Sequence, residues 1–261
     1  MLEAEHLSIA FGGVLAVDDV SLAVERGLVF SIIGPNGAGK TTLFNIFSGL
    51  YVPHAGSVRL SGQDVTAVKA HRLARLGLSR TFQNLQIFFR MTALENVMVA
   101  RHCHESTSAL GDLLHLPSVG RQNRETRRAA SAALERVGLG DLADRPAASL
   151  AYGCLKRLEI ARALATEPRV LLLDEPAAGC NPIEKQELEQ IIRQIAGDGV
   201  TVVLVEHDMR LVMNISDRIH VLANGRTLAE GTAAQVRSDP AVVQAYLGVH
   251  GSREATHAAC Q

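Results

Sequence analysis

The stretch GPNGAGKTT, residues 34–42, constrains the fold of this chain more than any other feature. It fits the pattern G-x-x-x-x-G-K-[ST] of phosphate-binding loops. A short apolar, β-prone run, 28–33, precedes it, and a segment without helix breakers, 42–47, follows it. A buried strand, a glycine loop and a helix in this order are what a phosphate cradle requires. The alternative is a glycine-rich turn that binds nothing, and the flanking strand and helix argue against it.

Each residue type in this loop suits the binding of phosphate. Glycines permit backbone angles that a Cβ atom forbids, and they expose N–H groups to an anion. The N-terminus of the following helix adds a partial positive charge. Lys40 is expected to reach the β- and γ-phosphates, and the Thr41 hydroxyl is expected to hold Mg²⁺. The predicted phosphate-binding set is Gly34, Pro35, Asn36, Gly37, Ala38, Gly39, Lys40, Thr41 and Thr42.

Composition and charge exclude several classes of function. The chain has 261 residues, is 47% hydrophobic and carries a net charge of −1, so neither a nucleic-acid partner nor a polybasic membrane contact is indicated. No apolar run approaches the roughly 18 residues of a membrane span, and the N-terminus lacks the pattern of a signal peptide. The four cysteines form no CxxC pair and indicate reduced thiols in a cytoplasmic protein. They are Cys103, Cys154, Cys180 and Cys260.

The first third of the chain reads as strands around the glycine loop. Residues 2–33 alternate apolar and polar positions, which predicts antiparallel strands leading into the buried strand. A further strand is expected at 56–60 and a short basic amphipathic helix at 67–76. The segment 79–84, SRTFQN, is expected to leave the β pattern and to enter a different region.

Residues 86–150 read as mostly helical. Thr92 with Glu95 forms a capping-box pattern that predicts a helix over 93–103. A surface excursion is expected over 105–123, followed by a long charged helix over 124–137. These features predict a helical subdomain inserted into an α/β core.

The last hundred residues restore the strand–helix alternation of a parallel sheet covered on both faces. Fully apolar strands are expected at 170–173 and 200–205, with an amphipathic helix at 183–197 between them. A short strand, a turn and a small helix are expected over 219–247.

Three polar sites follow buried strands and can therefore converge at one edge of the sheet. They are the glycine loop, the pair Asp174–Glu175 and His207. Asp174 suits a direct or second-sphere position beside Mg²⁺, and Glu175 suits a general base that acts on a water next to the γ-phosphate. Each of these residues alone could be an ordinary solvated strand end, and the phosphate loop favours the functional interpretation.

These motifs together resemble the ATP-binding subunit of an ABC transporter, over about residues 2–248 and in the family's order. GPNGAGKTT resembles Walker A, RTFQN places Gln83 at the Q-loop glutamine, VLLLDEP resembles Walker B with Glu175, and VEHD places His207 at the switch histidine. Phe11 matches the aromatic residue that stacks on adenine. The signature segment corresponds to Leu150, Ala151, Tyr152, Gly153 and Cys154, and the D-loop to Ala178, Gly179, Cys180 and Asn181.

The resemblance implies a P-loop NTPase with a RecA-like core, an N-terminal antiparallel β subdomain and an inserted α-helical subdomain. It divides the chain into a core at about 2–83 and 165–248, the insertion at about 84–164, and a flexible tail at 249–261. It implies ATP and Mg²⁺ as ligands, with Thr41, Gln83 and Asp174 around the metal, and Glu175, His207, Gln83 and Lys40 in catalysis.

The same resemblance implies partners. Two such subunits, identical or sister chains, would sandwich two ATP molecules, and each signature segment would serve the partner's nucleotide. The Gln83 loop and the helical subdomain would bind membrane permeases, with a periplasmic or extracellular solute-binding protein as an indirect partner and no nucleic acid. The chain would lie at the cytoplasmic face of the bacterial plasma membrane.

Four residues depart from the broad family pattern. Ala151 replaces the signature serine, Cys154 replaces Gln or Glu, and Cys180 and Asn181 replace Leu and Asp of the D-loop. The two thiols raise the possibility of a redox-sensitive ATPase; the alternative, small residues that simply fit, is favoured because buried thiols are usually inert.

Segments such as RTFQN, LAYG, EPAAGxNP and QAYLG resemble the LivG type of branched-chain amino-acid importers. Urea, amide and other amino-acid importers share much of this pattern, and the ATPase of lipopolysaccharide export is close in layout. A soluble ABC ATPase that acts on DNA is a remote alternative, because such proteins carry long coiled coils between Walker A and signature. A translation-type protein would carry two cassettes, and a P-loop kinase or GTPase does not need the LAYG segment.

Overall fold

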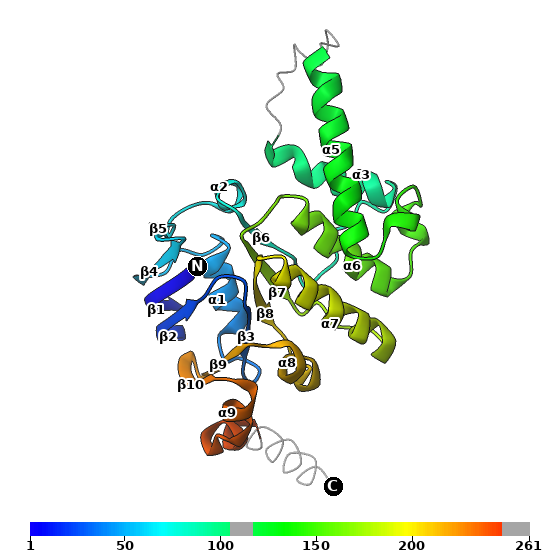
Figure 1. The fold of residues 1–261 in the computed structure, drawn as a ribbon. Coiled ribbons are helices and arrows are strands. Elements are labelled where there is room, and N and C mark those ends of the chain that lie inside the picture. Colours follow the sequence, from blue (N-terminus) through cyan, green and yellow to red (C-terminus); the bar gives the residue numbers. More distant parts are fainter. Residues whose placement is uncertain (105–116, 247–261) are drawn as a thin grey trace.

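The computed structural model describes residues 1–104 and 117–246, which form an α/β structure with two sheets (Figure 1). The strands are β1 (Leu2–Phe11), β2 (Val14–Val24), β3 (Val29–Ile33), β4 (Ala55–Leu60), β5 (Gln63–Asp64), β6 (Leu78–Arg80), β7 (Val170–Asp174), β8 (Thr201–Val205), β9 (Arg218–Ala223) and β10 (Arg226–Gly231). The α-helices are α1 (Lys40–Phe47), α2 (Ala70–Arg75), α3 (Ala93–Ala100), α5 (Pro117–Arg136), α6 (Tyr152–Leu164), α7 (Pro182–Gly197), α8 (Met209–Ile215) and α9 (Ala233–Ser238). The predicted tail, 249–261, and most of the predicted excursion, 105–116, lie outside the described residues.

The N-terminal sheet is antiparallel, as the alternating pattern predicts, with strand order β2-β1-β4-β5. The hairpin between β1 and β2 turns at Gly12 and Gly13, both of which have positive φ angles. The apolar side chains of this sheet and the buried face of α1 belong to one hydrophobic cluster. The sheet therefore packs against the helix that follows the glycine loop.

The six-stranded sheet has the order β10-β9-β3-β8-β7-β6 and is parallel from β9 to β6. Its central strands are fully buried because both faces are covered. In β7, Leu172 belongs to the cluster beneath α1, whereas Leu171 and Leu173 belong to the cluster on the opposite side. Strands β3, β7 and β8 thus end at the same edge of the sheet, which places the polar residues that follow them side by side.

The helical part consists of α3, α5 and α6, which lie above the parallel sheet in Figure 1. Thr92 caps α3 in the predicted capping box with Glu95. Leu134 of α5 and Leu158 of α6 belong to the same hydrophobic cluster as Leu173 of β7. The helical part therefore shares its core with the sheet, which fixes it next to the edge where β7 ends.

Three sequence predictions were wrong in detail. Leu78–Arg80 does not leave the β pattern but forms β6, an edge strand too short to show a period of two. Helix α5 begins at Pro117, where the fixed φ of proline suits a first helical position, rather than at residue 124. The region after 219 contains the hairpin of β9 and β10 rather than one strand.

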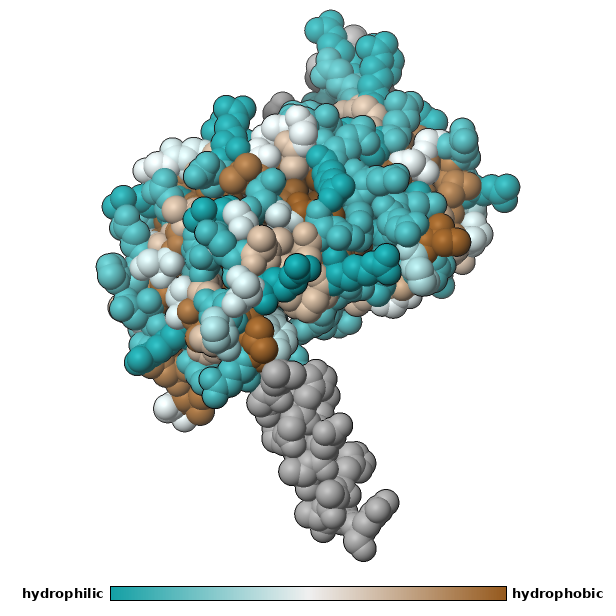
Figure 2. All heavy atoms as spheres, turned by 60° about the horizontal axis from the view of Figure 1, so that its bottom comes forward, coloured by the Kyte–Doolittle hydropathy of each residue, from teal (hydrophilic) through white to brown (hydrophobic). Residues whose placement is uncertain are grey.

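The described residues include no helix that is long and apolar enough to span a membrane. On the face shown in Figure 2, hydrophobic side chains form small separate groups among hydrophilic ones.

Candidate nucleotide site

The glycine loop adopts backbone angles that explain its sequence. Gly34, Gly37 and Gly39 have φ angles of 152°, 81° and 99°. A Cβ atom on Gly34 would lie 2.1 Å from the carbonyl oxygen of Leu222, and one on Gly39 would lie 2.4 Å from that of Ala16. Both positions accept only glycine, and Gly39 also forms the N-cap of α1. The loop therefore turns tightly into a helix N-terminus, the arrangement that binds phosphate.

Lys40, the first residue of α1, points back into its own loop. Its Nζ donates hydrogen bonds to the carbonyl oxygens of Gly34, at 2.7 Å, and Pro35, at 2.9 Å. Burial lowers the pKa of Lys40, and the nearby Glu175 carboxylate partly offsets this by raising it. The ammonium group is thus held at the mouth of the loop, where an anion would meet it.

A cavity of about 720 Å³ opens beside the loop. This volume lies within the range of about 300–1,000 Å³ that is usual for small-molecule sites. Its lining consists of Ala16, Asn36, Gly37, Ala38, Gly39, Lys40, Thr41, Thr42, Gln83, Glu175 and His207. The structure therefore brings the predicted phosphate loop together with three of the predicted catalytic side chains.

Glu175 joins the other two catalytic candidates. Its Oε1 lies 2.6 Å from Nε2 of His207, and its Oε2 accepts a hydrogen bond from Nε2 of Gln83 at 3.0 Å. Glu175 has a φ of 47°, an uncommon value for a non-glycine residue, and its N–H is bonded to the carbonyl oxygen of Val205. The carboxylate is therefore aimed by its backbone and held by a residue from each of two other segments.

Glu206 supports this arrangement, although it was not among the residues predicted for the site. The side chain is buried and accepts backbone hydrogen bonds from Ala177 at 2.8 Å, His207 at 2.9 Å and Asp208 at 3.2 Å. It thus ties the loop after β7 to the loop after β8. Its partner Ala177 is 29 residues away, so no local sequence signal identifies the contact.

Asp174 ends β7 but does not line the cavity. Its side chain is buried, and Oδ2 accepts a hydrogen bond from Nη2 of Arg80 at 2.6 Å. Thr81 Oγ1 also accepts from the Asp174 backbone N–H. Arg80 was not among the predicted site residues, because only the pairing of β6 with β7 brings it to Asp174.

The signature segment lies outside this cavity. Ala151 is the N-cap of α6, and the helix has no side-chain cap, so the first-turn N–H groups have no side-chain oxygen from the cap residue. A Cβ atom on Gly153 would lie 2.4 Å from Oε1 of Glu184, and one on Gly179 would lie 2.8 Å from Cε1 of Tyr152. The signature segment and the D-loop therefore pack against each other within one chain.

The D-loop residue Asn181 has a clear structural role. Its Oδ1 accepts hydrogen bonds from the N–H groups of Ile183 and Glu184, and the Glu184 side chain accepts one from Asn181. This capping box starts α7, for which Asn and Asp are about equally suited. Burial raises the pKa of the neighbouring Cys180 thiol, which lowers its reactivity.

Phe11, the predicted adenine-stacking residue, ends β1 and is exposed. Its ring centroid lies 5.2 Å from that of Tyr51 in a tilted arrangement. Phe11 does not line the cavity beside the loop, so the two aromatic rings form a separate exposed pair.

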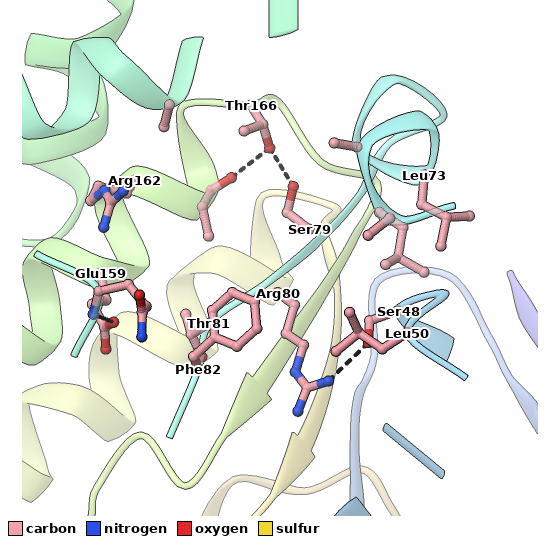
Figure 3. Close-up of a pocket in the computed structure, with 16 residues that line it drawn as sticks. Ser48, Leu50, Leu73, Ser79, Arg80, Thr81, Phe82, Glu159, Arg162 and Thr166 are labelled. Atoms are coloured by element: carbon pink, nitrogen blue, oxygen red, sulfur yellow. Dashed lines mark hydrogen bonds between the residues drawn. The ribbon is translucent and has the colours of Figure 1, made fainter. Parts of the chain in front are cut away.

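A second cavity of about 290 Å³ lies between the parallel sheet and the helical part (Figure 3). Among its lining residues are Ser48, Leu73, Arg80, Phe82, Glu159 and Arg162. Burial raises the pKa of Glu159 and lowers that of Arg162. Exposed apolar side chains at Phe82, Phe88 and Phe89 occur in the segment that runs past it.

Comparison with known protein families gives two matches. The model described as "ABC transporter" matches residues 17–178, and the model described as "Branched-chain amino acid ATP-binding cassette transporter" matches residues 226–252. Both descriptions agree with the resemblance that the sequence motifs suggested.

Several curated relatives align along nearly the whole chain. The branched-chain amino acid transport ATP-binding protein BraF of Pseudomonas aeruginosa is 49% identical over 95% of this chain and 98% of its own length. The LivG protein of Escherichia coli is 46% identical over the same shares. The lipopolysaccharide export ATP-binding protein LptB of Acidithiobacillus ferridurans is 37% identical over 95% of this chain and 97% of its own length.

Solved structures are similar in fold. An ATP-binding cassette of an ABC transporter in its ADP conformation has a TM-score of 0.83 and 34% identity, covering 95% of this chain and 98% of that one. A dimeric bacterial ABC transporter cassette has a TM-score of 0.74 and 26% identity, covering 89% and 99%. The P-loop NTPase fold predicted from the motifs is thereby confirmed.

Proposed function

The chain belongs to the ABC transporter family, and from this premise we propose that it hydrolyses ATP to drive an importer of branched-chain or related amino acids. The observation that carries the catalytic part is the placement of Glu175 between His207 and Gln83 at the cavity beside the phosphate loop. Glu175 acts as the base that takes a proton from the attacking water. His207 and Gln83 orient its carboxylate, and Lys40 with the loop N–H groups binds the phosphates.

The residues present fit Mg²⁺ in the way that ATPases use it. The described residues contain no cluster of three His, Cys, Asp or Glu side chains that could hold a metal by themselves. Mg²⁺ is usually bound by one or two protein groups together with substrate phosphates, which matches Thr41 and Gln83 in the cavity lining. Bound Mg²⁺ supplies positive charge beside the phosphate oxygens. Asp174, which is buried and paired with Arg80, would support this site from outside the cavity lining.

A second ATPase subunit completes the site in this proposal. The signature residues Leu150 to Cys154 do not line the cavity of their own chain, and α6 begins at Tyr152 with uncapped N–H groups. Such a helix start favours an anion, here the γ-phosphate held by the partner. The chain alone is then a poor ATPase, and its activity should rise with the concentration of a second subunit.

Membrane permeases bind at the second cavity. Its apolar residues and the exposed Phe82, Phe88 and Phe89 offer a hydrophobic contact for a partner segment. This proposal places the chain at the cytoplasmic face of the plasma membrane, with about 2–83 and 165–248 as the nucleotide-binding core and about 84–164 as the permease-facing insertion.

The amino-acid cargo is proposed from the relatives BraF and LivG, whose names state branched-chain amino acid transport. Lipopolysaccharide export remains the second candidate, because LptB is 37% identical. Uptake of labelled leucine, isoleucine and valine in cells with and without the gene distinguishes the two. Unchanged uptake together with defective lipopolysaccharide transport would favour export.

Glu175→Gln tests the catalytic assignment. The amide keeps the size of the side chain but cannot take a proton, so ATP binding should persist while turnover falls by about 100-fold or more. Dimers should then accumulate with ATP in gel filtration. Full turnover in this variant, measured as phosphate release, would refute the assignment of the base.

A further inference from the structure

Arg80 lines the second cavity and holds Asp174, the residue directly before Glu175 of the first cavity. It is the last residue of β6, and it lines the cavity between the sheet and the helical part. Its Nη2 donates to Oδ2 of Asp174 at 2.6 Å, directly before the catalytic candidate Glu175. Its Nη1 donates to Oδ1 of Asn45 at 2.7 Å and to Oγ of Ser48 at 2.8 Å, at the end of α1.

The guanidinium group also contacts the wall of the second cavity. Its carbon lies 5.4 Å from the ring centroid of Phe82 and 5.6 Å from that of Phe44. Figure 3 shows it between the Phe82 ring and Ser48. Phe82 is 43% exposed and immediately precedes Gln83, so it belongs to both the cavity wall and the loop that reaches Glu175.

This combination of contacts requires arginine. A guanidinium is a planar group with several donors in a fixed arrangement, and it also stacks on aromatic rings. A lysine ammonium at this position keeps the positive charge but is a compact point charge, which cannot hold the Asp174 carboxylate and the end of α1 in the same geometry.

The Arg80–Asp174 ion pair is buried and in contact with the Phe82 ring. The side chains of Arg80 and Asp174 are only 7% and 6% exposed. Attraction between charges is strong where water is excluded, so the two groups stay together when one of them is displaced. A partner segment that shifts the Phe82 ring therefore acts on the group that holds Asp174.

We propose that Arg80 is a positioning residue that couples the permease-docking cavity to the nucleotide site by fixing Asp174 and α1 on one side and contacting Phe82 on the other. The inference rests on the proposed function, because it assumes that the first cavity binds Mg²⁺ with ATP and that the second binds a permease segment. Arg80 does not touch the nucleotide; it acts through Asp174.

The test compares ATP affinity in the presence of Mg²⁺ with ATP affinity in EDTA, using the full chain and a fluorescent ATP analogue. The dissociation constant in EDTA divided by that in Mg²⁺ reports how much the metal contributes to ATP affinity. In Arg80→Lys this ratio should fall by about threefold or more, while the affinity in EDTA changes less than twofold. A merely structural role would weaken both affinities alike and leave the ratio unchanged.

Two further variants keep the test decisive if Arg80→Lys folds poorly. Asn45→Ala removes one contact of the guanidinium and should lower the ratio in the same direction by a smaller factor. Phe82→Leu alone should change the ratio. Added to a chain that already carries Arg80→Lys, it should cause no further change, because coupled residues give non-additive effects. Additive effects would mean that Phe82 acts independently of Arg80, which would overturn the coupling.

Arg101→Lys is the matched control. Arg101 is also mostly buried and holds the carbonyl oxygen of Ala165 and the carboxylate of Glu167, but neither contact belongs to the nucleotide site. The ratio in Arg101→Lys should equal that of the unmodified chain. An equal fall of the ratio in Arg101→Lys and in Arg80→Lys would refute the inference. An unmodified chain that binds no ATP would instead overturn the proposed function, and this inference with it.

Discussion

Replacement of the buried Glu206 by Gln tests whether one carboxylate aligns the two catalytic loops. Glu206 is 4% exposed and accepts three backbone hydrogen bonds through two oxygens, one from Ala177 and two from His207 and Asp208. Glutamine has only one oxygen to offer, and its NH₂ group can only donate. In either orientation of the amide, its NH₂ group then faces a backbone N–H group, and two donors cannot form a hydrogen bond.

The size of the effect follows from this count. The better orientation keeps the bonds to His207 and Asp208 and leaves the N–H of Ala177 without its acceptor. An unsatisfied buried polar group costs about 1–3 kcal/mol, and the loss of negative charge weakens the remaining bonds. The free energy of unfolding should therefore fall by about 2–4 kcal/mol, and ATP turnover should fall because the loops of Glu175 and His207 are no longer tied together.

Urea denaturation gives the change in stability, and phosphate release by the assembled transporter gives the turnover. Glu189→Gln is a matched control on α7, since the hydrogen bonds of Glu189 within residues 1–104 and 117–246 are two long ones of 3.5 Å to Asn214. It should change the stability by less than about 0.5 kcal/mol. A loss of stability in Glu206→Gln that is no larger than in this control would refute the role of the carboxylate.

The remaining predictions concern the loop and the thiols. Gly39→Ala should abolish ATP binding, measured by titration calorimetry, because its Cβ would lie 2.4 Å from the Ala16 carbonyl oxygen. In Gly37→Ala the new Cβ meets no atom within 4 Å, so the protein should still fold, with a free energy of unfolding lower by about 1–2 kcal/mol because of the positive φ. Equal effects of both substitutions would contradict the steric argument. Alkylation of Cys180 by a maleimide should be slow at neutral pH and become faster as the pH rises, because burial raises its pKa and the thiolate is the reactive form. Rapid labelling at pH 7, accompanied by loss of ATPase activity, would instead support redox sensitivity.

The sequence by itself determined the local features of the nucleotide site. The phosphate loop, the buried strands before it and before Glu175, and the capping box at Thr92 depend on residues a few positions apart. Backbone angles and hydrogen bonds within one turn set these features, so their sequence patterns are visible without the fold.

Only the tertiary structure decided how these pieces support one another. Arg80 meets Asp174 across 94 positions, and Glu206 meets Ala177 across 29, because strands distant in the sequence pair in the parallel sheet. Edge strand β6 has three residues, too few for a recognisable alternation, although its pairing brings Arg80 to Asp174 and to the wall of the second cavity. Such contacts depend on strand order and packing, which leave no periodic signal in the chain.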